Sequence, residues 1–488
     1  MRVGLALVVL AWFGHYAYVR ITTPPGSAED LRLAEESDGF DPAELDANSI
    51  ALAEVLSAMP VLTFDEPAPS GMEWLTDDGG TPRVDISDVT SGSWDPAGRT
   101  HLRVVVRHLT QPAMTAALEK VTQRRDRPFR MGFPTGVLAP GGPAVGYSEL
   151  RELAKAIVVR ARYHHAELGD LSGAWDDLKT VLLLSQAVQQ QYLIDMLVST
   201  ACDALALSEL QRMCREVEFT EEVAADIERT LCRLSAPTER WPQVMRGESA
   251  YVLRILIPCY TNDGQGNGWL VLGNQSWANA GFSGLGFPVP QDRSRLWGIA
   301  APLFNNRRTV EQKVERQFED LARITNLSYH QVLAHFDRLR EDGPGLNILD
   351  GPGSVFAVTD ADYQTHRRAY QLAVRATAQQ RAARIMVALN RYCGLNQRYP
   401  EQLDELVPGF LDESPLDPFC EQPFGYHLTD SGDYLLYSCG LDGDDDGGEP
   451  GRDASGNVRL FGEEGDLILT QPRREPRSEP QLHPTEEP

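Results

Sequence analysis

The sequence has few cysteines and none of the short motifs that mark common zinc, nucleotide and hydrolase sites. Its 7 cysteines are scattered, and none lies in a C-x-x-C pair, so nothing favours a structural zinc site. There is no G-x-x-x-x-G-K-[ST] phosphate loop, no H-E-x-x-H helix and no G-x-G-x-x-G turn after a strand. Ser283, in GFSGLG, lies outside the G-x-S-x-G pattern of many hydrolases. Local motifs therefore predict no catalytic residues.

Positive charge is also scarce. The chain has 45 Lys and Arg against 70 Asp and Glu, which gives a formal net charge of -25. A nucleic-acid partner is excluded because binding a polyanion requires a basic surface that releases counterions. The acidity is typical of a soluble surface. A second interpretation is that part of it is clustered to hold a cation.

The one long uncharged run lies at the N-terminus. Residues 3–19 (VGLALVVLAWFGHYAYV) lie between two arginines and carry no charged residue, although His15 interrupts the run. A membrane-spanning helix needs about 20 apolar residues. Aromatic rings gather toward the far end, where they favour the membrane–water boundary: Trp12, Tyr16 and Tyr18. We predict that residues 1–21 anchor the chain in a membrane, with the N-terminus cytoplasmic and the bulk periplasmic or extracellular.

Two alternatives to this anchor stay open. A cleaved signal peptide needs small residues soon after its apolar core, whereas Gly26-Ser27-Ala28 lies far from that core. The other alternative is a helix buried in the folded core. A signal peptide would lead to export, as the anchor does.

The rest of the chain divides by composition. Residues 22–100 are an acidic, loop-rich spacer, and residues 101–375 form a helical domain. Residues 376–470 form a small α+β module with an acidic loop. Residues 471–488 are rich in proline and charge, bury almost nothing and are expected to be disordered.

Helical periodicity dominates the middle of the chain. Apolar residues between 150 and 161 recur at steps of three and four, the chain breaks at Gly169-Asp170, and the pattern resumes over 171–188. This resembles one tetratricopeptide-type hairpin, but no second copy follows at that period. Further helices are expected over 193–215, 221–234, 309–340 and 363–396. The predicted fold class is mainly α, with helical hairpins or a bundle, a small C-terminal α+β module and one N-terminal transmembrane helix.

Two features of the helical domain invite a functional interpretation. Residues 256–306 are rich in Gly, Asn, Trp and Phe, and they form either an ordered structural loop or the wall of a cleft. The histidine pairs His164-His165 and His330 with His335 lack metal spacing on a helix, so we predict structural roles for them.

The C-terminal module carries a predicted hairpin and a cluster of acid. Residues 424–428 and 434–438 alternate like strands around a turn at 430–433. Cys420 and Cys439 flank this hairpin and could pair in an oxidising compartment. Four carboxylates then follow within five residues, at 442, 444, 445 and 446, with glycines around them. Such a cluster repels itself unless a cation neutralises it, and calcium takes about six to eight oxygen ligands.

The spacing Asp442-x-Asp444-x-Asp446-Gly447 matches the first half of an EF-hand loop, with Asp453 at the twelfth place. Against an EF-hand, Glu449 takes the place of an apolar residue and Pro450 follows it. No helices are expected on either side of the loop. A solvated acidic turn is the remaining alternative to a calcium site.

The order RYP…LDELVP…DPF…PFGY…YLLYS-G-DG…DDGG…GD-I resembles the C-terminal module of type II secretion major pseudopilins, over about 80 of the 488 residues. The resemblance implies a small antiparallel sheet and a calcium-binding loop. Its ligands would be the carbonyl of Leu441, the carboxylates of Asp442, Asp444 and Asp446, and Asp466. The start MRVGLALVVLAWFGHY lacks the pseudopilin Phe-Thr-Leu-x-Glu start, which weakens the interpretation of this chain as a filament subunit.

The helical hairpin and this ending together resemble uncharacterised membrane-anchored proteins of planctomycete-type bacteria. The function predicted is that of an extracytoplasmic scaffold or interaction protein with a structural calcium ion. The resemblance implies a link to secretion or envelope assembly, with other envelope proteins as partners. The alternative is an exported hydrolase whose cleft lies in the helical domain.

Overall fold

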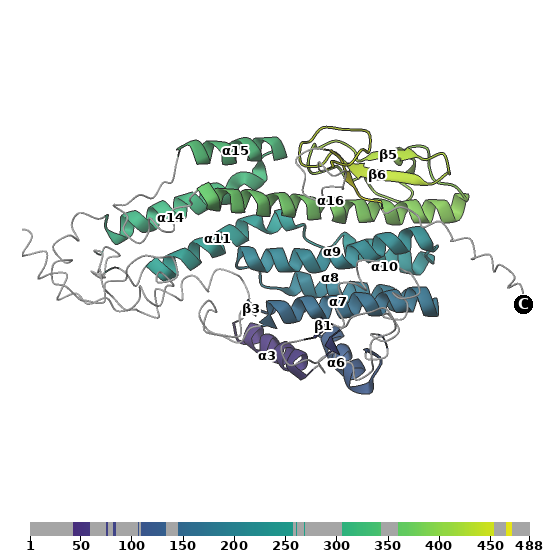
Figure 1. The fold of residues 1–488 in the computed structure, drawn as a ribbon, viewed down its shortest axis with the longest axis horizontal. Coiled ribbons are helices and arrows are strands. Elements are labelled where there is room, and N and C mark those ends of the chain that lie inside the picture. The colour runs from purple at the N-terminus through teal and green to yellow at the C-terminus, as the bar shows by residue number, and fades with distance from the viewer. Residues whose placement is uncertain are drawn as a thin grey trace, which may run out of the picture. The chain divides into compact units, whose positions relative to one another are not determined.

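A computed structural model of the chain describes residues 42–58, 75–76, 82–83, 106, 109–132, 145–256, 260, 268, 305–342, 360–452 and 465–470. The described residues are mainly helical, with a small antiparallel sheet near the C-terminus (Figure 1). None of the helices among them is long and apolar enough to cross a membrane. The predicted span over 3–19, the predicted disordered tail and most of the segment 256–306 lie outside the described residues.

The chain divides into two compact units, which are described separately. Unit 1 comprises residues 1–159, 180–203 and 234–377, and unit 2 comprises residues 160–179, 204–233 and 378–488. Four of the five dividing points fall within helices: α7 (Tyr147–Tyr163), α8 (Leu171–Ala187), α9 (Leu193–Glu216) and α16 (Asp360–Asn396).

Unit 1 contains most of the helices. Besides its parts of α7, α8, α9 and α16, it contains α3 (Pro42–Ala58), α6 (Pro112–Thr122), α11 (Pro237–Leu256), α14 (Arg307–Ala322), the 3-10 turn η6 (Arg323–Asn326) and α15 (Tyr329–Asp342). Two short strand pairs accompany them. β1 (Leu75–Thr76) runs antiparallel to β2 (Pro82–Arg83), and β3 (Met131–Gly132) runs parallel to β4 (Val145–Gly146).

Trp241 organises the core of unit 1. This α11 side chain is fully buried, and its indole Nε1 donates a hydrogen bond of 2.8 Å to the carbonyl of Leu321 in α14. Its ring meets that of Tyr370, in α16, edge to face at 5.1 Å between centroids. A buried indole needs such a partner for its N–H. One side chain thus joins three helices of this unit.

Polar groups are also buried in unit 1, at the start of α9. Asp195 accepts hydrogen bonds from the backbone N–H groups of Gln191 and Tyr192, at 3.1 and 2.9 Å, and from the hydroxyl of Tyr147 at 2.8 Å. The Glu248 carboxylate accepts from the N–H of Leu193 at 2.7 Å. These bonds satisfy donors that the first turn of a helix leaves without partners.

Unit 2 contains its parts of α7, α8, α9 and α16 together with η2 (His164–Leu168), α10 (Glu221–Leu231), the 3-10 turn η8 (Leu403–Leu406) and the C-terminal sheet. The element η2 is a π-helical turn, and Gly169 ends it with a φ of 66°. Glycine adopts this left-handed conformation without steric cost, which explains why the chain breaks where the sequence predicts.

A buried ion pair holds the two sides of this break together. The Arg160 guanidinium, in α7, donates to both oxygens of Asp177, in α8, with Nε at 3.1 and 2.9 Å. The Asp177 side chain is 5% exposed. Burial raises the pKa of Asp177, and the hydrogen bond and the charge of Arg160 lower it.

Asn390, in α16, closes the carboxyl end of α9. Its Nδ2 donates to the carbonyls of Cys214 and Val217, at 2.8 and 2.6 Å, and its Oδ1 accepts from the N–H of Phe219 at 3.1 Å. One amide therefore satisfies three backbone groups where a helix leaves its last carbonyls unpaired.

The C-terminal sheet has the order β5-β6-β7 and is antiparallel. β5 (Gly425–Leu428) and β6 (Tyr434–Ser438) form the hairpin drawn in Figure 1, and β7 is Leu467–Ile468. Gly432, with a φ of 78°, lies in the turn between β5 and β6. This hairpin confirms the strand pattern that the sequence predicts. Asp433, at the end of the turn, forms an ion pair with Arg215 of α9.

One predicted helix is interrupted. The sequence predicts continuous helix over 309–340, whereas the structure has α14, the turn η6 and then α15. The break falls at Leu327-Ser328, where the N–H of Ser328 donates to Gln331 Oε1 at 3.1 Å. A Gln side chain that reaches back to the residue before a helix marks a new N-terminus. The apolar periodicity on both sides of the break conceals it.

Replacing Arg160 by Met is expected to lower the free energy of unfolding by about 3 to 5 kcal/mol, because it leaves the buried Asp177 carboxylate without its guanidinium. Urea denaturation at pH 7 measures the change. The matched control is Arg323→Met, whose partner Glu319 is 59% exposed, and this change should cost less than about 1 kcal/mol. Equal effects of the two substitutions would show that the Arg160 pair is not buried as described.

The Asp195 carboxyl predicts a dependence of stability on pH. Burial raises its pKa from 3.8 to about 7. The folded state therefore binds this proton more tightly than the unfolded state, so the contribution of Asp195 to stability is greatest below pH 3.8 and declines as the pH rises to about 7. Asp195→Asn should flatten this decline in urea denaturation at a series of pH values. An unchanged slope in Asp195→Asn would contradict the assignment.

Candidate functional site

The acidic loop follows β6, and the described residues include all five predicted ligands. Leu441 and Asp442 are half-buried, Asp444 and Asp446 are exposed, and Asp466 is 4% exposed, just before β7. The N–H of Asp466 donates to the carbonyl of Glu449 at 2.9 Å. The fold therefore brings Asp466 back beside the loop, although it lies twenty residues further along the sequence than Asp446.

Asp442 joins the two sides of the loop. Its Oδ2 accepts from the N–H of Gly465 at 2.8 Å, and its Oδ1 lies 3.3 Å from the N–H of Asp444. The backbone at Gly465 has a φ of 87°, and a Cβ there would lie 2.2 Å from the N of Gly451. Only glycine allows this approach, so Asp442 and Gly465 together set the path of the loop.

Asp445, which the sequence analysis did not assign as a ligand, is held by a tyrosine. The Tyr437 hydroxyl, from β6, donates to Asp445 Oδ1 at 3.1 Å, and the N–H of Gly447 donates to the same oxygen at 2.9 Å. Burial and the hydrogen bond to Asp445 raise the pKa of Tyr437 to about 12. The alternation of β6 does not reveal this contact because it depends on how the loop folds back.

Asp466 has one carboxylate oxygen that is paired and one that is not. Its Oδ2 accepts from the N–H of Gly448 at 2.6 Å, whereas its Oδ1 is buried and has no hydrogen-bond partner. Burial raises the pKa of Asp466, the nearby backbone N–H groups of Gly448 and Asp446 lower it, and the charges of Asp445 and Asp446 raise it. A buried carboxylate oxygen without a donor is costly unless a cation or a proton reaches it.

The carboxylate and carbonyl oxygens of these residues are suitable ligands for a hard cation, although they are not arranged around a common centre. Among the described residues, no Lys or Arg forms an ion pair with the carboxylates at 442, 444, 445, 446 or 466. Within the described part of the chain, no three of these carboxylates have oxygens that all lie within 4.8 Å of one another. The exposed Asp444 and Asp446 side chains would have to turn toward Asp466 to complete a shell. Asp453, the twelfth residue of the EF-hand alternative, lies outside the described residues.

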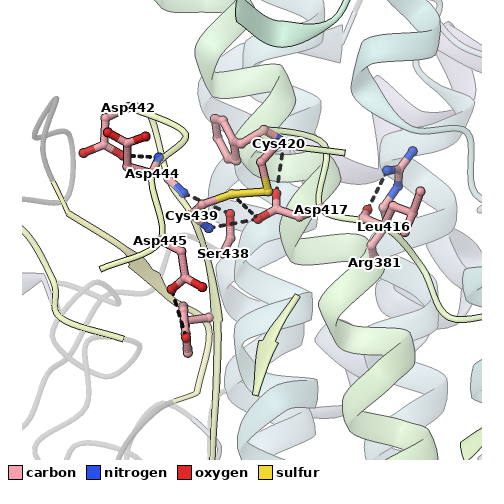
Figure 2. Close-up of a disulfide and its surroundings, with 12 residues drawn as sticks. Arg381, Leu416, Asp417, Cys420, Ser438, Cys439, Asp442, Asp444 and Asp445 are labelled. Atoms are coloured by element: carbon pink, nitrogen blue, oxygen red, sulfur yellow. Dashed lines mark hydrogen bonds between the residues drawn. A yellow bond between two sulfur atoms is a disulfide. The ribbon is translucent and has the colours of Figure 1, made fainter. Parts of the chain in front are cut away.

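A disulfide lies immediately before the loop (Figure 2). Cys420 and Cys439, whose pairing the sequence left open, are joined with a Cα–Cα distance of 6.7 Å. The Asp417 carboxylate is beside it, where Oδ2 accepts from the N–H of Cys439 at 2.9 Å and Oδ1 accepts from the N–H of Phe419 at 3.0 Å. The sequence analysis missed Asp417. Its place in the DPF series is a signal that could have drawn attention to it.

Within the described part of the chain, the predicted histidine pairs do not belong to a compact group of metal-ligand atoms. His165 Nε2 lies 3.8 Å from Glu216, and burial lowers the pKa of His165. His164 Nδ1 lies 3.8 Å from Asp170 and 3.9 Å from Asp177, but these three do not form a compact ligand group within the described residues. Burial also lowers the pKa of His335 in α15. The segment 256–306, on which a hydrolase cleft would depend, lies mostly outside the described residues.

The described structure thus defines a mainly helical protein with a small C-terminal antiparallel sheet, an acidic loop and a disulfide. Comparison of the chain with protein-family models, with curated proteins and with solved structures gives no match.

Proposed function

We propose that this chain is a membrane-anchored, extracytoplasmic scaffold or interaction protein whose C-terminal module is stabilised by a calcium ion. Residues 3–19 would hold it in the membrane, with the N-terminus cytoplasmic and the bulk periplasmic or extracellular. Its partners would be other envelope proteins. The link to secretion or envelope assembly rests on the resemblance to pseudopilins alone, because a fold does not fix a function.

The observation that carries the calcium proposal is the unpaired Oδ1 of Asp466. This buried oxygen has no hydrogen-bond donor, and burial, together with the charges of Asp445 and Asp446, raises the pKa of its carboxyl group. A bound dication would supply the missing positive charge. The same ion would also relieve the repulsion among the loop carboxylates, for which no basic partner lies within the described residues.

Calcium suits this loop better than softer metals do. The available donors are carboxylates and backbone carbonyls, which are hard oxygen ligands. The carbonyl of Leu441 and the carboxylates of Asp442, Asp444, Asp446 and Asp466 would hold the ion, with Asp445 kept nearby by Tyr437. The ion's role would be structural. It would fix the return of the chain to β7 and so hold the third strand on the hairpin.

Calcium is therefore expected to raise the thermal stability of the full-length chain in detergent, compared with the same sample in excess chelator. Extracellular modules bind calcium with Kd of roughly 10⁻⁴ to 10⁻³ M. An excess of about 100-fold over Kd would add about 2.7 kcal/mol. Asp466→Asn should abolish the calcium-dependent part of the melting temperature and leave the melt in chelator at least as high as that of the unmodified chain.

The matched control is Asp430→Asn, which removes an exposed carboxylate from the hairpin turn of the same module. This variant should respond to calcium as the unmodified chain does. If Asp466→Asn keeps the full calcium response, the ion does not use this carboxylate and the loop is a solvated acidic turn.

Membrane anchoring predicts a second result. The full-length chain should sediment with membranes and resist extraction by high salt, whereas a chain lacking residues 1–21 should remain in the soluble fraction. Protease added outside the cytoplasmic membrane should digest the bulk of the full-length protein. Mass spectrometry of the mature N-terminus separates an anchor from a cleaved signal peptide. Aggregation of the shortened chain would indicate that the segment belongs to the core.

A further inference from the structure

The second group of interest is Asp417, Cys420 and Cys439. One ligand atom from each lies within 4.8 Å of the other two, and no other such trio of His, Cys, Asp or Glu occurs among the described residues. Asp417 Oδ2 lies 3.1 Å from Cys439 Sγ. Asp417 is 1% exposed and Cys439 is 6% exposed, so this is an interior cluster, unlike the acidic loop.

The backbone fixes the direction of the Asp417 carboxylate. The N–H of Asp417 donates to the carbonyl of Gln422 and the N–H of Glu421 donates to the carbonyl of Asp417, both at 2.8 Å. Arg381 donates to the neighbouring carbonyl of Leu416 at 2.7 Å, as Figure 2 shows. These bonds hold the turn that presents Asp417 to the sulfur atoms.

No cationic side chain among the described residues contacts the Asp417 carboxylate directly. Within that part of the chain it forms no ion pair with Lys or Arg; backbone N–H groups, a serine hydroxyl and the cysteine sulfur contact it, and the charge of Arg381 also stabilises it. Burial raises its pKa. In the oxidised form these hydrogen bonds and the charge of Arg381 stabilise the carboxylate, whereas a dication bound to the reduced sulfur atoms would contact it directly.

Two thiolates and one carboxylate are a ligand set for zinc. Zinc binds sulfur at about 2.3 Å and carboxylate oxygen at about 2.0 to 2.2 Å, and three protein ligands leave a fourth position for water. Thiolates favour such a soft cation over calcium. The acidic loop, with oxygen donors only, has the opposite preference.

We propose that Asp417, Cys420 and Cys439 form a second cation site, which binds Zn²⁺ when the Cys420–Cys439 disulfide is reduced. A dithiol reduces the S–S bond to two thiols and itself becomes a disulfide, so two electrons and two protons pass to the protein. Zn²⁺ then displaces the two thiol protons to solvent. The disulfide and the metal are thus alternative states of one cluster. A disulfide oxidant that takes two electrons from the thiolates, and two protons from solvent, becomes two thiols and so releases the ion.

The test uses the full-length chain in detergent, with Cys232→Ser and Cys393→Ser to remove the free thiols among the described residues that are not buried. Cys259, which lies outside the described residues, is also replaced by Ser. A phosphine reduces the disulfide and becomes the phosphine oxide, with oxygen from water. Co²⁺ is then titrated without oxygen. We expect a near-ultraviolet thiolate-to-cobalt absorption band that saturates at one ion per chain, appears only after reduction and is lost when Zn²⁺ is added.

The variants assign the ligands. Cys420→Ser and Cys439→Ser should each abolish the band, and Asp417→Asn should weaken Co²⁺ binding by about tenfold or more. The exposed control Asp412→Asn and the calcium-loop variant Asp442→Asn should leave it unchanged. The calcium proposal can therefore fail while this one stands, and the reverse also holds. No band after reduction, or an unchanged affinity in Asp417→Asn with circular dichroism showing a folded chain, would overturn the proposal.

Discussion

The packing of unit 2 depends on the hydrogen bonds made by the last backbone carbonyl groups of α9. The last carbonyls of a helix have no partner within the helix, and here the end is enclosed by other parts of the unit. Asn390 reaches it from α16 and occupies three backbone groups between Cys214 and Phe219. A buried carbonyl without a hydrogen-bond donor is costly. The Asn390 amide therefore fixes the position along α16 at which this helix meets the end of α9.

The same helix end positions the C-terminal module. Arg215, one residue beyond Cys214, pairs with Asp433 at the end of the hairpin turn, and its guanidinium lies 5.3 Å from the centre of the Tyr434 ring. Tyr434 is buried, and its ring meets that of Tyr399 edge to face, with 4.7 Å between the ring centroids. The hairpin is therefore held by one charged contact and one aromatic cluster, both of which lead back to α9 and the end of α16. The acidic loop begins directly beyond this anchored strand.

Local patterns in the sequence predict what is local in the structure. The alternation over 424–438 predicts the hairpin, and Gly169 predicts the break between α7 and α8, because both depend on neighbouring residues. The end of α14 is not predicted, since apolar spacing continues across Leu327 while a single Gln side chain starts the next helix. Asn390 and Asp417 cannot be found in this way, because their partners lie 176 and 22 residues away along the chain. For the candidate site, the sequence indicates the cluster of acid but not that Asp466 would be its buried member or that Tyr437 would hold Asp445.

In the acidic loop, glycines allow the backbone conformation and aspartates carry the charge. Gly448 has a φ of 89°, and a Cβ there would lie 2.5 Å from Leu435 Cδ2, while Gly465 leaves no room beside Gly451. The backbone path is thus set by these glycines together with Asp442 and Asp466, whose carboxylates accept from the N–H groups of Gly465 and Gly448. The exposed carboxylates of Asp444 and Asp446 project from that frame. Over evolutionary time such a loop can exchange Asp444 or Asp446 for Asn or Ser and change its net charge and ion affinity in single steps. A loop with fewer carboxylates has less repulsion for an ion to relieve, so the same glycine frame would return to β7 with a weaker need for calcium.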